Sequence, residues 1–280
     1  EVRRMYKVLA LEERYISQNQ QPILNKLKVQ RDQGYKRDIL SEQEYHELWE
    51  YLQFKYTTRK NNPKVPAREL AKRKIFYQFV FILSNVGFRP KELLGVKMHE
   101  IIDNPAWDEA TRKKNVLIKV RKENSKTGKA RTCVAPVKER LDKILKEYRL
   151  LGIKHQPDDY LFVCPTSPTR DHYKYEMMWR RFKNVLNDSG LKEKTVKQDK
   201  SITLYSFRHQ YACWRLRYGN VSIHLLAKQM GTSINKIENT YGHIMVEKQA
   251  DAITKDQQFV KEEASVWNDQ LTQIVLDQDD

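Results

Sequence analysis

Apolar residues recur at three- to five-residue spacing along most of the chain, and this helical period is the feature that most constrains its fold. One such stripe runs from Leu70 to Val86, with Pro66 at its expected first turn and Gly87 as a natural stop. Other stripes occupy residues 137–148, 175–186, 207–217, 223–230 and 234–241. The chain is therefore predicted to be mainly α-helical.

Only one pair of segments has the pattern of neighbouring strands. Residues 116–120 and 131–134 flank a turn at 124–128, which predicts a β-hairpin with a small basic tip. Ser41 is placed to cap a helix through Leu52, and Pro90 is placed to start a short one. The lysine-rich segment 192–200 is expected to be a loop. The expected fold class is mainly α with a small antiparallel β-hairpin or sheet (α+β).

The charge of the chain is strongly positive and unevenly distributed. Lysine and arginine number 52 against 36 aspartate and glutamate residues, which gives a net charge of +16. After Tyr241, three lysines face nine acidic residues, so this tail carries −6 and the rest of the chain +22. The basic body predicts a polyanionic partner such as nucleic acid, whereas the acidic tail is repelled by one.

Cysteine usage and hydropathy argue against several protein classes. Cys133, Cys164 and Cys213 are far apart and form no C-x-x-C pair, which argues against a disulfide framework and a zinc cage and fits a reducing cytoplasm. The densest apolar run, Ile75–Leu83, is less than half of a bilayer span, so no membrane-spanning segment is expected. The chain begins with Glu1 and no signal segment follows, so we expect it to be a piece of a longer chain.

Four residues become informative only when they are taken together. Singly, Arg89 fits a solvated charge at a helix start, and Lys126 fits a turn lysine. Arg208 fits the exposed face of a helix, and Tyr241 fits a core position. As a set they have a second interpretation. Two guanidiniums can hold the nonbridging oxygens of a phosphodiester while a tyrosine attacks phosphorus and a lysine protonates the leaving oxygen.

The segments that hold these residues resemble the motifs of the tyrosine recombinases, also called phage integrases. GFRPKEL at 87–93 is similar to the family's first arginine motif, and SKTGKAR at 125–131 to the hairpin with its catalytic lysine. YSFRH at 205–209 is similar to its His-x-x-Arg box, and NTYGH at 239–243 to its nucleophile segment. The match spans about residues 38–245. It implies a tyrosine recombinase-like catalytic domain that cuts and rejoins DNA at specific sites through a 3′-phosphotyrosine intermediate.

The resemblance implies roles for the matching residues, with no metal and no cofactor. Arg89 and Arg208 are expected to clamp the phosphate, Lys126 to act as general acid and Tyr241 as nucleophile. Two further catalytic positions depart from the family pattern and are expected to supply single hydrogen bonds. These are Tyr205, where the family usually has histidine, and Thr232, where it has histidine or tryptophan.

Three residues are expected to support the site rather than react. Glu92 accompanies the first arginine and is expected to hold it or its neighbours. His209 and His243 invite a metal site, but no further ligand at suitable spacing completes one, so structural hydrogen bonding is favoured.

The resemblance also implies a domain organisation and partners. Residues 1–37 are expected to hold the last helix of a core-binding domain plus a linker, residues 38–246 the catalytic domain, and residues 247–280 an acidic tail that docks on a neighbouring protomer. The implied partners are double-stranded DNA, further copies of the chain in a tetramer on DNA, and accessory DNA-bending or directionality proteins, with no membrane. A cytoplasmic protein of a bacterium, archaeon or phage, carried by a mobile element, is expected.

Two other functions stay open on the sequence. A type IB topoisomerase shares this chemistry but relaxes supercoils as a monomer, and recombination of paired sites separates the two. A DNA-binding protein that has lost its chemistry is the non-enzyme alternative, because Tyr205 and Thr232 replace the family's usual side chains.

Overall fold

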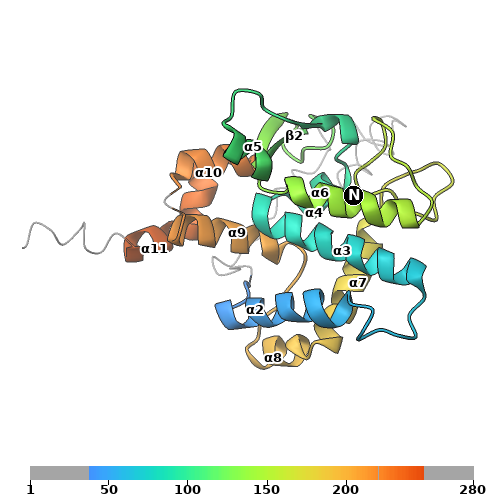
Figure 1. Ribbon diagram of the computed structural model, residues 1–280. Coiled ribbons are helices and arrows are strands. Elements are labelled where there is room, and N and C mark those ends of the chain that lie inside the picture. Colours follow the sequence, from blue (N-terminus) through green and yellow to red (C-terminus); the bar gives the residue numbers. More distant parts are fainter. Residues whose placement is uncertain (1–37, 220, 249–280) are drawn as a thin grey trace, which may run out of the picture. The chain divides into compact units, whose positions relative to one another are not determined.

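Helices form at the positions that the periodicity predicts. The computed structural model describes residues 38–219 and 221–248, with side chains up to Tyr241, all within the second of two compact units, Glu1–Lys36 and Arg37–Asp280. The predictions for residues 1–37 and for the tail beyond residue 248 lie outside the described residues. In chain order the elements of Figure 1 are α2 (Glu42–Glu50), the π-helix η3 (Tyr51–Tyr56), α3 (Ala67–Val86), α4 (Pro90–Leu94), the 3-10 helix η4 (Met98–Glu100), β1 (Ile101–Ile102), α5 (Glu109–Lys114), β2 (Val116–Val120), β3 (Arg131–Ala135), α6 (Lys138–Leu150), α7 (Tyr175–Asp188), α8 (Leu191–Lys197), α9 (Ser206–Arg217), α10 (Ile223–Met230) and α11 (Ile234–Lys248).

Local capping chemistry sets the start of α2. The Ser41 hydroxyl accepts a hydrogen bond from the Glu44 amide at 3.2 Å, and the Glu44 carboxylate accepts one from the Ser41 amide at 2.7 Å. This reciprocal pair satisfies two backbone donors that a helix start leaves unpaired. The predicted helix is confirmed, and the π-helix η3 extends it to Tyr56.

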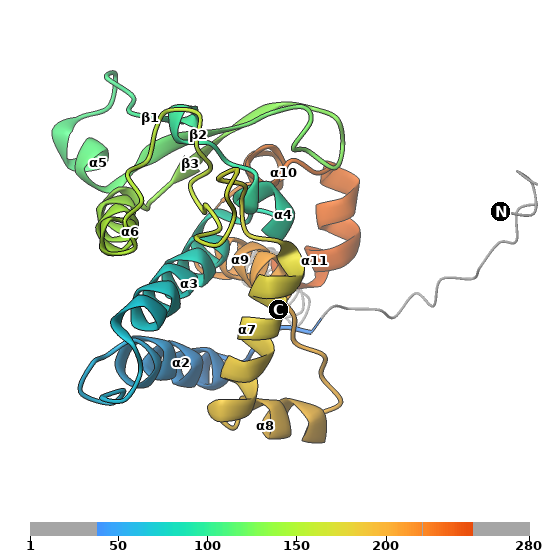
Figure 2. The same cartoon turned by 90° about the vertical axis from the view of Figure 1, so that its right-hand side faces the viewer.

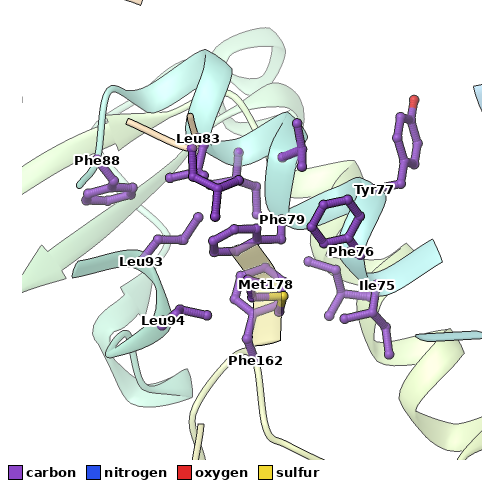
Figure 3. Close-up of a cluster of buried hydrophobic side chains, with 14 of the residues drawn as sticks. Ile75, Phe76, Tyr77, Phe79, Leu83, Phe88, Leu93, Leu94, Phe162 and Met178 are labelled. Carbon is purple, nitrogen blue, oxygen red and sulfur yellow. The ribbon is translucent and has the colours of Figure 1, made fainter. Parts of the chain in front are cut away.

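The core is built around α3, which packs against α6 and α9. Figure 3 shows its buried face, where the Phe79 ring meets the Phe162 ring edge-on with centroids 5.3 Å apart. The helix ends at Gly87, whose φ of +76° lies in the left-handed region. A Cβ at this glycine would lie 2.4 Å from the ring of Tyr211 in α9, so only glycine allows this approach. The end of α3 is thereby fixed against α9.

The sheet is small and antiparallel, in the order β1-β2-β3. The predicted hairpin is confirmed: Val116 pairs with Ala135 and Val120 with Arg131. The third strand, β1, was not predicted, because a two-residue strand is too short to show alternation. Figure 2 shows the sheet beside α6, and β3 packs against both α3 and α10. The expected fold class is confirmed.

One local prediction is wrong. The segment 192–200, expected to be a loop, forms α8 over Leu191–Lys197. Leu191 and Thr195 are both buried, one turn apart on a helix, while the lysines between them face outward. Two anchors in seven residues are too few to show a helical period among lysines, and tertiary packing decides the conformation instead.

The last three helices form a second apolar cluster of their own. Its buried members include Tyr211 and Leu216 of α9, Leu226 of α10, and Ile237 and Tyr241 of α11. Packing of α11 against α9 and α10 therefore brings the predicted nucleophile next to the helix that carries Arg208. Across the described part of the chain, no helix combines the length and apolar character needed to cross a membrane.

Candidate active site

Arg89 lies at the start of α4, where Pro90 fixes the first helical turn. Glu92 is 1% exposed and accepts two hydrogen bonds from Arg89, one from the backbone amide at 3.1 Å and one from the guanidinium at 2.5 Å. The other guanidinium nitrogen of Arg89 donates to the carbonyl of Gly231 at 3.3 Å. Glu92 thus contacts the arginine that it was predicted to support. Arg89 in turn links α4 to the turn before α11.

A second arginine, Arg131 of β3, completes the partners of Glu92. Its guanidinium contacts the two carboxylate oxygens at 2.7 and 3.4 Å. Burial by itself raises the pKa of the Glu92 carboxyl, but the hydrogen bonds and charges of Arg131 and Arg89 outweigh it and hold that pKa below its ordinary value. Both carboxylate oxygens of Glu92 accept hydrogen bonds from arginines, so the ionised side chain links α4 to β3.

Arg208, in the first turn of α9, is buried without an ion-pair partner among the described residues. It is 7% exposed, and its guanidinium donates to the carbonyl of Gly87 at 2.5 Å. Burial and then the positive charge of Arg89 lower the pKa of Arg208 to about 10, so it stays protonated at neutral pH. A buried cation beside a second cation is favourable for a bound anion, and the carboxylate nearby is already committed to other arginines.

Tyr241 of α11 reaches the same cluster. It is 5% exposed, and it lies close enough to Arg208 for its ionised form to interact with that guanidinium. Its hydroxyl shares a hydrogen bond with Nδ1 of His209, the residue after Arg208, and the two ring centroids are 5.8 Å apart. Three predicted site residues from α4, α9 and α11 therefore meet around one cluster.

The turn between α10 and α11 is tied to the arginines. Gly231 has φ +63°, and a Cβ there would lie 2.7 Å from the guanidinium of Arg131. The next residue, Thr232, is partly exposed, and its amide donates to the carbonyl of Ala227 at 3.0 Å. Thr232 therefore lies directly beside the carbonyl that Arg89 binds.

Sequence reasoning missed Gln229 as part of this site. Its side-chain amide donates to the Val134 carbonyl at 2.8 Å and accepts from the Val134 amide at 3.1 Å, so it pairs with β3 as a strand would. Its backbone carbonyl accepts from Arg131 at 3.3 Å. A glutamine on a helix gives no sequence signal of such a contact; its place two residues before Gly231 is the only hint.

Lys126 is not brought into the cluster. It is exposed in the connection between β2 and β3, and it forms no hydrogen bond or ion pair with any residue that the structure describes. The base of this connection is nevertheless anchored on α4. Asn124 donates to the carbonyl of Glu92 at 2.7 Å, and Arg121 donates to the carbonyl of Gly95 at 2.9 Å.

Two further predicted site residues are Tyr205 and His243. Tyr205 immediately precedes α9 and is half-buried, with its ring centroid 6.5 Å from that of Tyr175 in α7. The side chain of His243 lies outside the described residues. Among the described residues no group of three His, Cys, Asp or Glu side chains is placed to hold a metal ion.

Comparisons with known proteins identify the fold. No family model and no curated protein matches the sequence. Among solved structures, the chain is similar to XerH site-specific recombinase bound to palindromic difH substrate in a post-cleavage complex, with a TM-score of 0.51 and 16% identity over 83% of this chain. It is also similar to XerH in a pre-cleavage complex, with a TM-score of 0.52 and 18% identity over 77% of this chain.

The chain spans about half the length of these XerH chains, 54% and 53%. The resemblance to the tyrosine recombinases is thus confirmed at the level of the fold: the chain has the fold of their catalytic domain. A shared fold does not by itself carry an activity, so function is argued from the site.

Proposed function

We propose that this chain is a site-specific DNA recombinase that cuts and rejoins double-stranded DNA through a 3′-phosphotyrosine intermediate. The observation that carries the proposal is Arg208. Its guanidinium is buried beside Arg89 and Tyr241 and forms no ion pair with a carboxylate among the described residues. Burial is the main reason that the pKa of Arg208 is lowered to about 10. A phosphate would supply the missing anion next to a hydroxyl nucleophile.

The two arginines bind the scissile phosphate. Guanidiniums donate parallel hydrogen bonds to two oxygens of one phosphate, and they stabilise the charge that grows on those oxygens in the pentacoordinate transition state. The hydrogen bonds of Arg208 with the Gly87 carbonyl and of Arg89 with Glu92 support this role, because they hold the two guanidiniums in place. Thr232, beside the carbonyl that Arg89 contacts, donates one further hydrogen bond to the phosphate.

Tyr241 attacks the phosphorus and Lys126 protonates the leaving 5′ oxygen. The phosphotyrosine conserves the energy of the broken bond, so rejoining needs no ATP. Lys126 is exposed in the connection between β2 and β3, so its ammonium group can turn toward a bound phosphate. Tyr205 contributes a hydroxyl at the edge of the site.

Assembly belongs to the same proposal. Exchange of strands between two duplexes needs several protomers, so DNA binds a homotetramer, helped by accessory DNA-bending or directionality proteins. Residues 38–246 act as the catalytic domain, residues 1–37 belong to a core-binding domain and linker, and the acidic residues 247–280 dock on a neighbouring protomer. The protein acts in the cytoplasm and is encoded by a mobile element of a bacterium, an archaeon or a phage.

The test is formation of a covalent complex by the full chain. Duplexes are selected from random sequence for tight binding, nicked at successive positions so that cleavage releases a short strand, and incubated with the parent protein and with Tyr241→Phe. The parent is expected to form a denaturant-resistant adduct and the variant none. Binding without an adduct at any nick position would favour a DNA-binding protein, and relaxation of plasmids without recombination of paired sites would favour a topoisomerase.

A further inference from the structure

One contact in the site is not explained by phosphate binding. The hydroxyl of Tyr241 shares a hydrogen bond with Nδ1 of His209, the residue that directly follows Arg208 in α9. Successive residues on a helix diverge by about 100°, so Arg208 is directed to the Gly87 carbonyl while His209 is directed to α11. The helix thus presents a cation and an imidazole on adjoining faces.

The chemistry of tyrosine attack requires a proton acceptor at this position. A phenol has an ordinary pKa near ~10 and is protonated at neutral pH, and a neutral phenol is a weak nucleophile. Tyr241 is 5% exposed, so its proton does not pass freely to bulk water. A group that touches the hydroxyl must take it.

Other nearby groups are unsuited to this task. The guanidiniums of Arg89, Arg131 and Arg208 are donors only. Glu92 has both oxygens engaged by arginines, and its lowered pKa makes it a poor base. Tyr205 is itself a phenol and accepts a proton no better than Tyr241 does.

We propose that His209 is the general base that activates Tyr241, a role that rests on the proposed function. With Nδ1 unprotonated, the Tyr241 hydroxyl donates to it. As the O–P bond forms and the bond from phosphorus to the 5′ oxygen breaks, the phenolic proton passes to Nδ1, while the leaving oxygen takes its proton from Lys126. On rejoining, the attacking 5′ hydroxyl gives its proton back to Lys126, the bond from phosphorus to the Tyr241 oxygen breaks, and His209 returns its proton to Tyr241.

The experiment compares His209→Asn with His224→Asn in the full chain. Asparagine keeps a polar atom near the position of Nδ1 but cannot take up a proton, and His224 is an exposed histidine of α10 that serves as a matched control. The rate of adduct formation on nicked duplexes and the affinity for uncleaved duplexes are measured from pH 6 to 8.5. The lowered pKa of Glu92, the raised pKa of Arg131 and the pKa of about 10 of Arg208 keep these three groups of the cluster charged in this range.

At pH 7, His209→Asn is expected to form the adduct roughly 10²-fold more slowly than the parent, with unchanged DNA affinity. The defect should shrink as the pH rises, because more of the phenol ionises unaided. A rate within threefold of the parent, or a defect equal at every pH, would overturn the base role. His209→Gln is measured in parallel; if His209→Asn does not fold, as judged by circular dichroism, the glutamine variant must show the same pH-dependent defect, and its absence would overturn the role.

The outcomes separate this role from the proposed function. If the parent forms no adduct at all, the proposed function fails and the base role with it. If the parent and His224→Asn form the adduct and the His209 variants match them, only the base role fails.

Discussion

At the residue scale, the buried carboxylate of Glu92 holds two arginines that come from distant parts of the chain. Removing its charge leaves Arg89 and Arg131 without a carboxylate partner among the residues that the structure describes, in an environment with little water. Breaking a buried ion pair from one side costs about 3–5 kcal/mol, and glutamine recovers part of this through its hydrogen bonds. Glu92→Gln is therefore expected to lower the free energy of unfolding by about 2–4 kcal/mol in urea titrations at pH 7.

The pH dependence of stability tests the same residue. Because the folded pKa of Glu92 lies below its unfolded value, its contribution is present above the unfolded pKa and is lost as the pH falls through the folded one. The stability gap between the parent and Glu92→Gln should therefore narrow as the pH falls below about 4.5. Glu139→Gln, in an exposed pair with Lys143, is the control and should leave the free energy of unfolding close to that of the parent. A gap that is constant with pH would contradict this account.

Gly231 tests the contact between the α10–α11 turn and Arg131. Gly231→Ala adds a methyl group 2.7 Å from the guanidinium and forces a non-glycine residue into φ +63°. The matched control is Gly152→Ala, where φ is +79° but a Cβ meets nothing within 4 Å. The control should cost about 1 kcal/mol of stability for backbone strain alone, and Gly231→Ala should cost clearly more and slow adduct formation. Equal losses of stability in the two variants would mean that the Arg131 side chain moves away from the added methyl group at no cost.

At the element scale, the connection between β2 and β3 determines whether Lys126 can act as the acid. Lys126→Ala is expected to slow adduct formation by roughly 10²- to 10⁴-fold. A 5′-bridging phosphorothiolate has a leaving group that needs no proton, so it should rescue Lys126→Ala far more than Arg208→Ala. Lys129→Ala, an exposed neighbour in the same connection, should cleave like the parent. Equal rescue of the lysine and arginine variants would remove Lys126 from this role.

The elements show which features a sequence can predict. Signals within one turn of the chain, such as Ser41 with Glu44, Pro90, and Gly87 after α3, predict helix ends because the physics that fixes them is local. The short strand β1 and the lysine-rich α8 could not be predicted, since their conformation depends on packing with distant segments.

In the candidate site, too, local sequence motifs predicted some residues, whereas the contacts between distant segments could not be predicted. The resemblance of three short segments to the recombinase motifs predicted Arg89, Arg208 and Tyr241, and the fold brings these three together. The contacts of Arg131 with Glu92 and of Gln229 with Val134 join residues 39 and 95 positions apart, which no local pattern encodes. The hydrogen bond between Tyr241 and His209 likewise depends on how α11 packs on α9.

At the scale of the whole molecule, charge separates a basic body from an acidic tail. The tail after Tyr241 carries −6 and the rest +22, so DNA repels the tail and attracts the body. Deleting residues 256–280 is expected to leave binding to a single site similar or tighter and to weaken cooperative assembly on paired sites. Gel-shift titrations of single-site and paired-site duplexes measure both. Unchanged cooperativity would show that the tail takes no part in assembly.

The proposed reaction links the Tyr241 hydroxyl to DNA. The most direct measurement is mass spectrometry of the covalent complex after exhaustive digestion with nuclease and protease. A peptide containing Tyr241 is expected to carry a 3′-linked nucleotide, and all adduct should be lost in Tyr241→Phe. A nucleotide on any other residue, or an adduct that persists in Tyr241→Phe, would contradict the proposed reaction.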